Sequence, residues 1–105
     1  MSKVIETTKF TLNLDVSLEV FLLANREVNE WIEVQPGFHS RFLTQKADES
    51  WLDIIIWENE EAANKIDELF YEALGNSKFM QLLNPESVET SFSNVVVTLS
   101  SHHDE

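Results

Sequence analysis

Three consecutive isoleucines, Ile54 to Ile56, constrain the fold of this chain more than any other feature. They lie within Trp51 to Glu58, a segment of aromatic and β-branched residues that is typical of a β-strand. Because successive side chains of a strand point to opposite faces, both faces of this strand are apolar. An antiparallel sheet with one face in water alternates apolar and polar residues instead. The sequence therefore predicts a sheet that is covered on both sides.

This strand is expected to pair with the segment that precedes it. Pro36-Gly37 opens a strand from Phe38 to Lys46, and Ala47 to Ser50 provides a four-residue turn. In a regular hairpin, alternation predicts that one face carries Phe38, Ser40, Phe42 and Thr44 together with Trp51, Asp53, Ile55 and Trp57. The opposite face then carries His39, Arg41, Leu43 and Gln45 together with Leu52, Ile54 and Ile56.

The remaining elements follow from propensity and periodicity. Strands are expected at residues 3–12 and 87–99, and helices at residues 17–34 and 60–74, with a short helical segment from Lys78 to Leu83. With no repeat or linker in the sequence, residues 1–99 are expected to form a single domain, followed by a polar tail at 100–105.

The order β-α-β-β-α-β predicts an α+β protein with a ferredoxin-like fold, in which helices cover one face of an antiparallel four-stranded sheet. Two helices leave the other face uncovered, although the strand at Ile54 to Ile56 is apolar on both faces. A second copy of the chain is the simplest cover for that face. The sequence therefore predicts a homodimer in which two sheets face each other, a dimeric α/β barrel.

Charge and composition exclude several classes of partner. The chain has 105 residues, with 7 basic and 19 acidic side chains and a net charge of −12. Such an acidic protein repels phosphate backbones and anionic lipid surfaces, so neither a nucleic acid nor a membrane is an expected partner. With no cysteine, no leader pattern and no long apolar run, the expected location is the cytoplasm.

Two short motifs resemble a known family. Pro36-Gly37-Phe38 enters the second strand, and Trp57 ends the third strand directly before Glu-Asn-Glu-Glu-Ala-Ala. Together with the order of elements over residues 3–99, these motifs resemble the antibiotic biosynthesis monooxygenase-like family of the dimeric α/β-barrel superfamily. The resemblance implies a cofactor-independent monooxygenase acting on small aromatic phenols or quinols. The alternative that it leaves open is a non-catalytic binding protein or a structural homodimer of the same superfamily.

One branch of that family, the haem-degrading enzymes, does not fit this sequence. The resemblance would require an asparagine in the first strand, where this chain has Thr8, and a tryptophan in the second long helix, where it has Ile66. It would also require a histidine near the end of that helix, but none occurs between His39 and His102. Haem degradation is therefore not expected.

Two residues are candidate catalytic bases. Histidine side chains ordinarily titrate near neutral pH, and His39 is expected opposite Glu58, so the two residues are candidates for a general base. The alternative is a cross-strand polar pair without a catalytic role. Asp53 lies between Trp51 and Ile55 on an apolar face, where burial would raise its pKa and favour proton transfer. Its alternative partners are Thr44 and Lys46.

Aromatic side chains are candidates for a flat ligand pocket between the sheet and the helices. The same residues would otherwise form an ordinary core. The predicted lining residues are Phe38, Phe42, Trp51, Trp57, Phe70 and Phe79, with Trp31 and Phe92 as further candidates.

No cofactor or metal is expected. His102 and His103 are adjacent but stand on the polar tail, which is not a preformed metal site. The glycines are limited to Gly37 and Gly75, so a glycine-rich phosphate loop is excluded.

Overall fold

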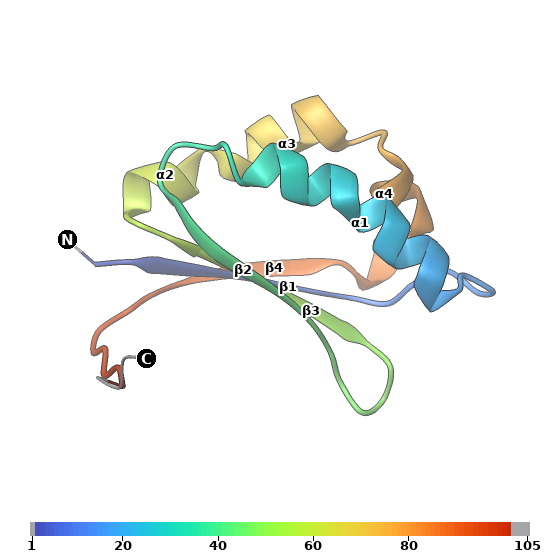
Figure 1. Ribbon diagram of the computed structural model, residues 1–105, viewed down its shortest axis with the longest axis horizontal. Coiled ribbons are helices and arrows are strands. Elements are labelled where there is room, and N and C mark those ends of the chain that lie inside the picture. The colour runs from blue at the N-terminus through green and yellow to red at the C-terminus, as the bar shows by residue number, and fades with distance from the viewer. Residues whose placement is uncertain (1, 102–105) are drawn as a thin grey trace.

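The computed structural model describes residues 2–101. Its centre is a four-stranded antiparallel sheet with the order β2-β3-β1-β4 (Figure 1). The strands are β1 (Val4–Phe10), β2 (Phe38–Gln45), β3 (Trp51–Trp57) and β4 (Glu89–Asn94). The helices are α1 (Leu18–Ile32), α2 (Glu60–Asn64), α3 (Ile66–Leu74) and α4 (Lys78–Leu82), and Pro85–Ser87 forms one 3₁₀ turn, η1. The predicted ferredoxin-like fold is confirmed.

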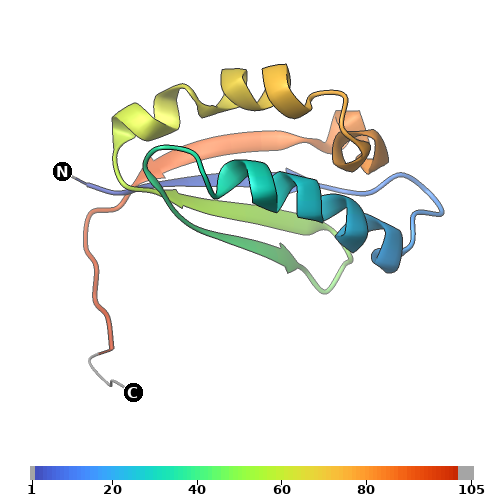
Figure 2. The ribbon, with the colours of Figure 1, turned by 45° about the horizontal axis from the view of Figure 1, so that its top comes forward.

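All the helices lie on one face of the sheet (Figures 1 and 2). Three helix starts are capped by a polar side chain: the Val20 amide donates to Ser17 Oγ at 3.2 Å, the Ala62 amide donates to Asn59 Oδ1 at 2.9 Å, and the Met80 amide donates to Ser77 Oγ at 3.3 Å. We call the face under the helices the helix face and the opposite one the open face. The helix face therefore carries the core and any enclosed site.

The sequence placed α1 and α4 correctly, but two other elements differ from expectation. The helix expected at residues 60–74 is divided at Lys65 into α2 and α3. The last strand ends at Asn94 rather than at residue 99. After it, the Val95 amide still donates to the Lys3 carbonyl at 2.9 Å, and the chain then leaves the sheet. The predicted tail at 100–105 lies mostly outside the described residues.

The predicted assignment of β2 to its two faces is wrong, because the pairing with β3 shifts between Phe38 and Ser40. The shift places Phe42 opposite Ile54, on the open face, and brings Arg41 to the helix face opposite Ile55. An extra residue at one point of a strand reverses the direction of every side chain after it. The irregularity at His39 therefore exchanges the two predicted faces of β2 from Ser40 onward, whereas Phe38 keeps its predicted place beside Trp57.

Gly37 is required at the start of β2. Its φ angle is +83°, and a Cβ at this position would collide with the Cβ of Ala62 in α2. Only glycine adopts this backbone angle freely and leaves room for the helix. The Pro-Gly pair thus fixes how closely α2 approaches the sheet.

The core on the helix face consists of two clusters. One gathers aromatic residues at the α1–α4 end, where the rings of Phe21 and Trp51 lie 4.8 Å apart. The other surrounds Trp57, which is completely buried, and includes Val4 and Ile32. These clusters hold α1 and α3 against the sheet from both ends.

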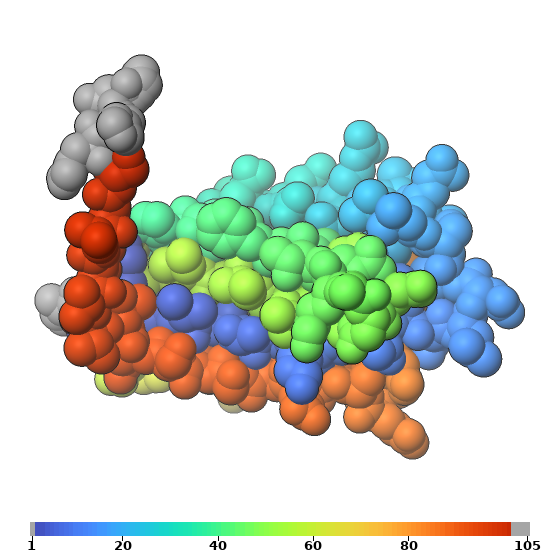
Figure 3. Space-filling view, turned by 90° about the horizontal axis from the view of Figure 1, so that it is seen from below, coloured from blue at the N-terminus to red at the C-terminus, as the bar shows by residue number. Residues whose placement is uncertain are grey.

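The open face is apolar along its middle. Ile5 of β1 and Leu52, Ile54 and Ile56 of β3 share it and are only half-buried, and Phe42 is 54% exposed. Figure 3 looks onto this face and shows the segment after β4 standing out at one end. Within that segment Val96, Val97 and Leu99 are at least 83% exposed. We call residues 95–101 the C-terminal arm.

Across residues 2–101, the structure contains no helix with the length and hydrophobicity needed to cross a membrane.

Candidate functional site

The helix face contains a partly open cavity of about 110 Å³ between the sheet and helices α1, α3 and α4. Its apolar wall is formed by Phe10, Val28, Ile32, Ile55, Ile66, Phe70, Phe79, Met80, Leu83 and Val88. Its polar groups are Glu6, Thr8, Asp53, Asp67, Tyr71 and Thr90. Apolar walls with a few converging polar groups are typical of small-molecule sites.

Strand alternation explains how the polar groups reach the cavity. Val4, Glu6, Thr8 and Phe10 alternate along β1, so the same strand face that buries Val4 and Phe10 also turns Glu6 and Thr8 inward. Thr90 of β4 is paired with Thr8, and their hydroxyl oxygens lie 3.0 Å apart. The floor of the cavity is therefore polar at the centre of the sheet.

Glu6 is the most deeply buried acid of the site, with 6% of its surface exposed. The indole N–H of Trp57 donates to its Oε1 at 3.0 Å. Burial raises the pKa of Glu6 to about 8; the Trp57 hydrogen bond opposes this, while a hydrogen bond with Asp67 and the negative charges of Asp67 and Asp53 add to it. Glu6 is thus mostly a neutral carboxylic acid at pH 7.

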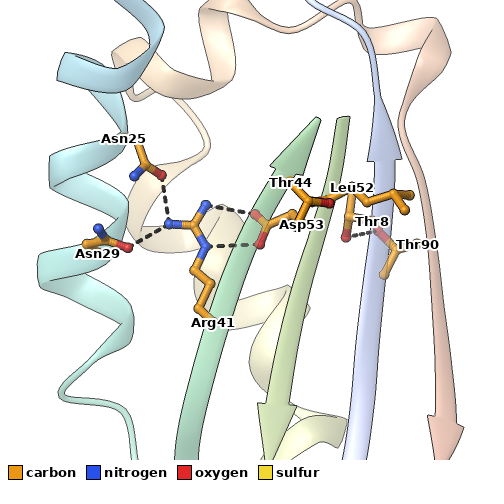
Figure 4. A network of polar contacts seen from close by, with 8 residues as sticks. All are labelled: Thr8, Asn25, Asn29, Arg41, Thr44, Leu52, Asp53 and Thr90. Atoms are coloured by element: carbon orange, nitrogen blue, oxygen red, sulfur yellow. Dashed lines mark hydrogen bonds and ion pairs between the residues drawn. The ribbon is translucent and has the colours of Figure 1, made fainter. Parts of the chain in front are cut away.

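Asp53 is held by a buried ion pair with Arg41 (Figure 4). The guanidinium donates from Nε to Oδ1 at 2.9 Å and from Nη2 to Oδ2 at 2.8 Å, and the two side chains are only 4% and 12% exposed. Arg41 Nη1 also donates to Asn25 and Asn29 of α1, at 2.7 and 2.8 Å. This network fixes α1 over the sheet beside the cavity.

The structure separates the two candidate bases. Asp53 lines the cavity, and its oxygens bind Arg41 rather than the Thr44 or Lys46 considered from the sequence. His39 is exposed at the irregularity of β2, and its Nδ1 lies 3.0 Å from Ser40 Oγ. The expected pairing of His39 with Glu58 is not formed: Glu58 contacts Lys3, at 4.0 Å. Only Asp53 is therefore placed to meet a ligand of the cavity.

The predicted aromatic residues are divided among three places. Phe70 and Phe79 line the cavity. Trp51 and Trp57 are buried in the two core clusters, and Phe38 packs on Trp57 with the rings 6.0 Å apart. Phe42 is on the open face because of the shifted pairing. Of the six predicted residues, only Phe70 and Phe79 thus line the cavity, where Phe10 and Tyr71 are further aromatic residues.

Glu6, Thr8 and Asp67 were not identified from the sequence. A signal was present for the two strand residues, because β1 places polar side chains at positions that alternate with apolar ones on the buried face. Asp67 carried no comparable signal, since acids in the first turn of a helix are common. Within residues 2–101, no cluster of three acidic or histidine side chains is arranged to hold a metal ion, and His102 and His103 lie outside that range.

Comparison with solved structures shows what the fold resembles. SnoaB, a cofactor-independent oxygenase from Streptomyces nogalater, matches with a TM-score of 0.65 and 20% identity over 96% of this chain and 100% of its own. The monooxygenase from the gene ActVA-Orf6 of Streptomyces coelicolor, solved with nanaomycin D, matches with a TM-score of 0.61 and 19% identity over 95% and 93%.

A dimeric ferredoxin-like protein from an uncultured marine organism matches with a TM-score of 0.71 and 13% identity, over 96% of this chain and 94% of its own. No protein-family model and no curated protein sequence matches the chain. The resemblance to antibiotic biosynthesis monooxygenase-like proteins is therefore confirmed at the level of the fold, along nearly the whole chain.

Proposed function

We propose that this protein binds a small hydroxyaromatic compound, a phenol or quinol, in the helix-face cavity and oxygenates it with O₂, without metal or flavin. The observation that carries the proposal is a partly open, mainly apolar cavity with a buried, proton-binding carboxyl group on its wall. The shared fold with two oxygenases, one of them named as cofactor-independent, supports it.

The chemistry needs only a proton acceptor and a dry site. Removal of a proton from the hydroxyl group makes the ring electron-rich enough to react directly with O₂. One oxygen atom is added to a ring carbon and becomes the hydroxyl oxygen of a hydroxyquinone, and the other leaves as water with two hydrogens from the substrate. The substrate supplies all four electrons, so no external reductant is required.

The size of the cavity supports a compound with a single aromatic ring. An apolar cavity of about 150 Å³ in another protein is known to hold benzene, and the cavity here is about 110 Å³. A ligand of three fused rings would need the helices to move apart. The proposed substrate class is therefore a single-ring quinol rather than a large polyketide.

Asp53 and His39 remain the bases proposed from the sequence, and Asp53 is the better placed of the two because it lines the cavity. To act as a base it would have to share its charge with Arg41, which already donates to both carboxylate oxygens. That engagement favours the alternative function, in which the chain binds a hydroxyaromatic ligand without chemical turnover.

We also propose that the chain forms a homodimer through the open face, in the cytoplasm. Ile5, Ile54 and Ile56 form an apolar strip in the middle of that face, and the C-terminal arm adds exposed Val96, Val97 and Leu99 on the same side of the sheet (Figure 1). Exposed apolar surface of this kind marks protein interfaces. A second copy supplies the matching surface by two-fold symmetry.

The test is oxygen consumption with methylhydroquinone. We expect one O₂ consumed for each hydroxylated quinone formed, one labelled oxygen in the product when ¹⁸O₂ is used, and no accumulation of hydrogen peroxide. Thr90→Phe, which fills the cavity, should abolish the activity, and Thr90→Ser should retain it. Saturable binding of methylhydroquinone without oxygen consumption would favour the binding function, and no binding would contradict both.

A further inference from the structure

The buried acid Glu6 has a geometry that neither candidate base has. It lies at the centre of the sheet on β1, paired with Ile55 on one side and Phe92 on the other. Trp57 holds its Oε1, and Glu6 contributes to the cavity wall. Glu6 also shares a hydrogen bond with the carboxyl group of Asp67 on the same wall. A buried carboxyl group that is held in place by a fixed donor and faces a cavity is arranged to exchange a proton with a ligand.

The charges around Glu6 come from two sides of the cavity. On α3 the neighbouring titratable groups are Asp67 and Tyr71, and on β3 it is Asp53, already neutralised by Arg41 of β2. The cavity residues of α1, α4 and β4 are uncharged: Val28, Ile32, Phe79, Met80 and Thr90. Glu6 therefore meets negative charge but no free cation among these residues, which makes it a stronger base than an ordinary carboxylate.

We infer that Glu6 accepts the hydroxyl proton of an uncharged hydroxyaromatic ligand while Trp57 keeps its carboxyl group in position. The inference rests on the ligand class of the proposed function. In the step, the ligand O–H bond breaks, the proton moves to a carboxylate oxygen of Glu6, and the electron pair stays on the ligand oxygen. The charge of the site is unchanged, because the carboxylate becomes neutral as the phenolate forms.

This arrangement also selects against anionic ligands. A ligand that carries its own carboxylate would place a further negative charge beside Glu6 and Asp67 in a site of low dielectric constant. A ligand whose hydroxyl is methylated would provide no donor to the Glu6 carboxylate beyond the Trp57 N–H that it already has. An uncharged phenol or quinol satisfies both conditions.

Proton linkage provides a test that does not involve oxygen. A ligand that donates to ionised Glu6 binds this form best, so its affinity must rise with pH until free Glu6 is ionised, near pH 8. If binding lowers the pKa of Glu6 by one unit, the affinity rises about tenfold. Resorcinol is a suitable probe, with 1,3-dimethoxybenzene and 3,5-dihydroxybenzoate as matched compounds.

The experiment measures the affinity of the full chain for each compound by calorimetry between pH 6 and pH 9. We expect a rise of about three- to tenfold for resorcinol and none for the dimethyl ether, and at least about tenfold weaker binding of the carboxylate. Glu6→Gln keeps the oxygen that accepts the Trp57 N–H, so the variant should fold and bind the ether normally. Its affinity for resorcinol should be independent of pH up to the ionisation of resorcinol itself.

Tyr71→Phe should retain the rise, because Tyr71 does not receive the proton. Asp67→Asn should retain it as well but move it to lower pH, because the hydrogen bond and the charge of Asp67 both raise the pKa of Glu6. A flat profile in the natural sequence, or an unchanged rise in Glu6→Gln, would overturn the assignment. This outcome is distinct from that of the oxygenation test. If resorcinol binds as expected but methylhydroquinone is not turned over, the role of Glu6 stands and the oxygenase function fails. If Glu6→Gln leaves turnover unchanged, Glu6 is not the proton acceptor and the oxygenase function stands.

Discussion

The two faces of the sheet differ in whether their side chains find partners within the same chain. On the helix face, the polar side chains of the strands have partners within the chain: Glu6 with Trp57, Asp53 with Arg41, and Thr8 with Thr90. On the open face, Ile5, Ile54 and Ile56 form an apolar strip that no helix covers. The same strands therefore line the cavity on one side and carry, on the other, the uncovered apolar strip proposed for association.

This difference explains the unusual run of isoleucines. Ile55 points into the cavity, whereas Ile54 and Ile56 point to the open face. A strand needs apolar residues at every position only when both of its faces are covered. Substitutions on the two faces should therefore have different effects.

The largest effect is expected on the open face. Ile54→Asp places a charge in the middle of the apolar strip, twice in each symmetric dimer, and should weaken dimerisation at least about a hundredfold. Sedimentation velocity over a range of concentrations measures the change. Ala73→Asp introduces the same charge at an exposed position of α3 and should leave the dimer intact. If the natural chain is a monomer, or if the Ile54→Asp protein still dimerises, the open face is not the dimer interface.

The next effect concerns ion pairs on the two faces. Arg41→Met leaves Asp53 charged and buried, and should lower the free energy of unfolding by about 3–5 kcal/mol. Lys9→Met removes an ion pair with Glu89 whose side chains are 59% and 74% exposed, and should change it by less than about 1 kcal/mol. Urea denaturation of both variants measures the difference. Equal losses would show that Arg41 does not stabilise the helix face.

Glu6 predicts a pH dependence of stability. Because its pKa is about 8 in the folded chain and 4.5 as a free side chain, the folded state binds more protons between these values, so Glu6 makes the protein less stable as pH rises. The difference in unfolding free energy between Glu6→Gln and the natural sequence should therefore shift by about 2 kcal/mol in favour of the variant as the pH rises from 6 to 8. Chemical denaturation at both pH values measures this gain.

The exposed Glu89→Gln serves as the control and should show no comparable trend. If the gap between Glu6→Gln and the natural chain stays constant with pH, Glu6 is already ionised at pH 6 and the description of the site is wrong.

The smallest effect on the free energy of unfolding is expected for two adjacent threonines of β1. Thr8→Val removes the hydroxyl contact with Thr90 on the helix face and should cost about 1 kcal/mol. Thr7→Val changes the adjacent residue on the open face and should alter the unfolding free energy of the monomer by less than about 0.5 kcal/mol. Thermal unfolding of both variants in the Ile54→Asp background separates stability from dimerisation. A larger cost at Thr7 would reverse the comparison.

The fold was predictable because its signals are periodic. The alternation of strands and the helical spacing of Phe21, Val28 and Ile32 indicated the order of elements. The expectation from the isoleucine run, that a second copy covers the open face, stays a prediction. Element ends were less predictable, since the break at Lys65 and the end of β4 at Asn94 depend on packing rather than on local composition.

The site was predicted only in part, for a physical reason. A shift of one residue at His39 exchanges the faces of β2, and no local sequence signal distinguishes a bulged strand from a regular one. Arg41 therefore reached Asp53 unexpectedly, and Phe42 left the predicted pocket. Glu6 was missed although its position in β1 is regular. Its carboxylate can be predicted to point into the core only when the buried face of the strand is already known.

The most direct test of the division between the two faces uses the isoleucine methyl groups. The chain contains six isoleucines: Ile32, Ile55 and Ile66 line the cavity, and Ile5, Ile54 and Ile56 lie on the open face. NMR spectra of the δ1-methyl-labelled protein are recorded during titration with methylhydroquinone without oxygen, and again during dilution. We predict that the ligand shifts the three cavity methyl signals and that dilution shifts the three open-face signals. Ligand-induced shifts confined to the open-face methyl groups would contradict this account.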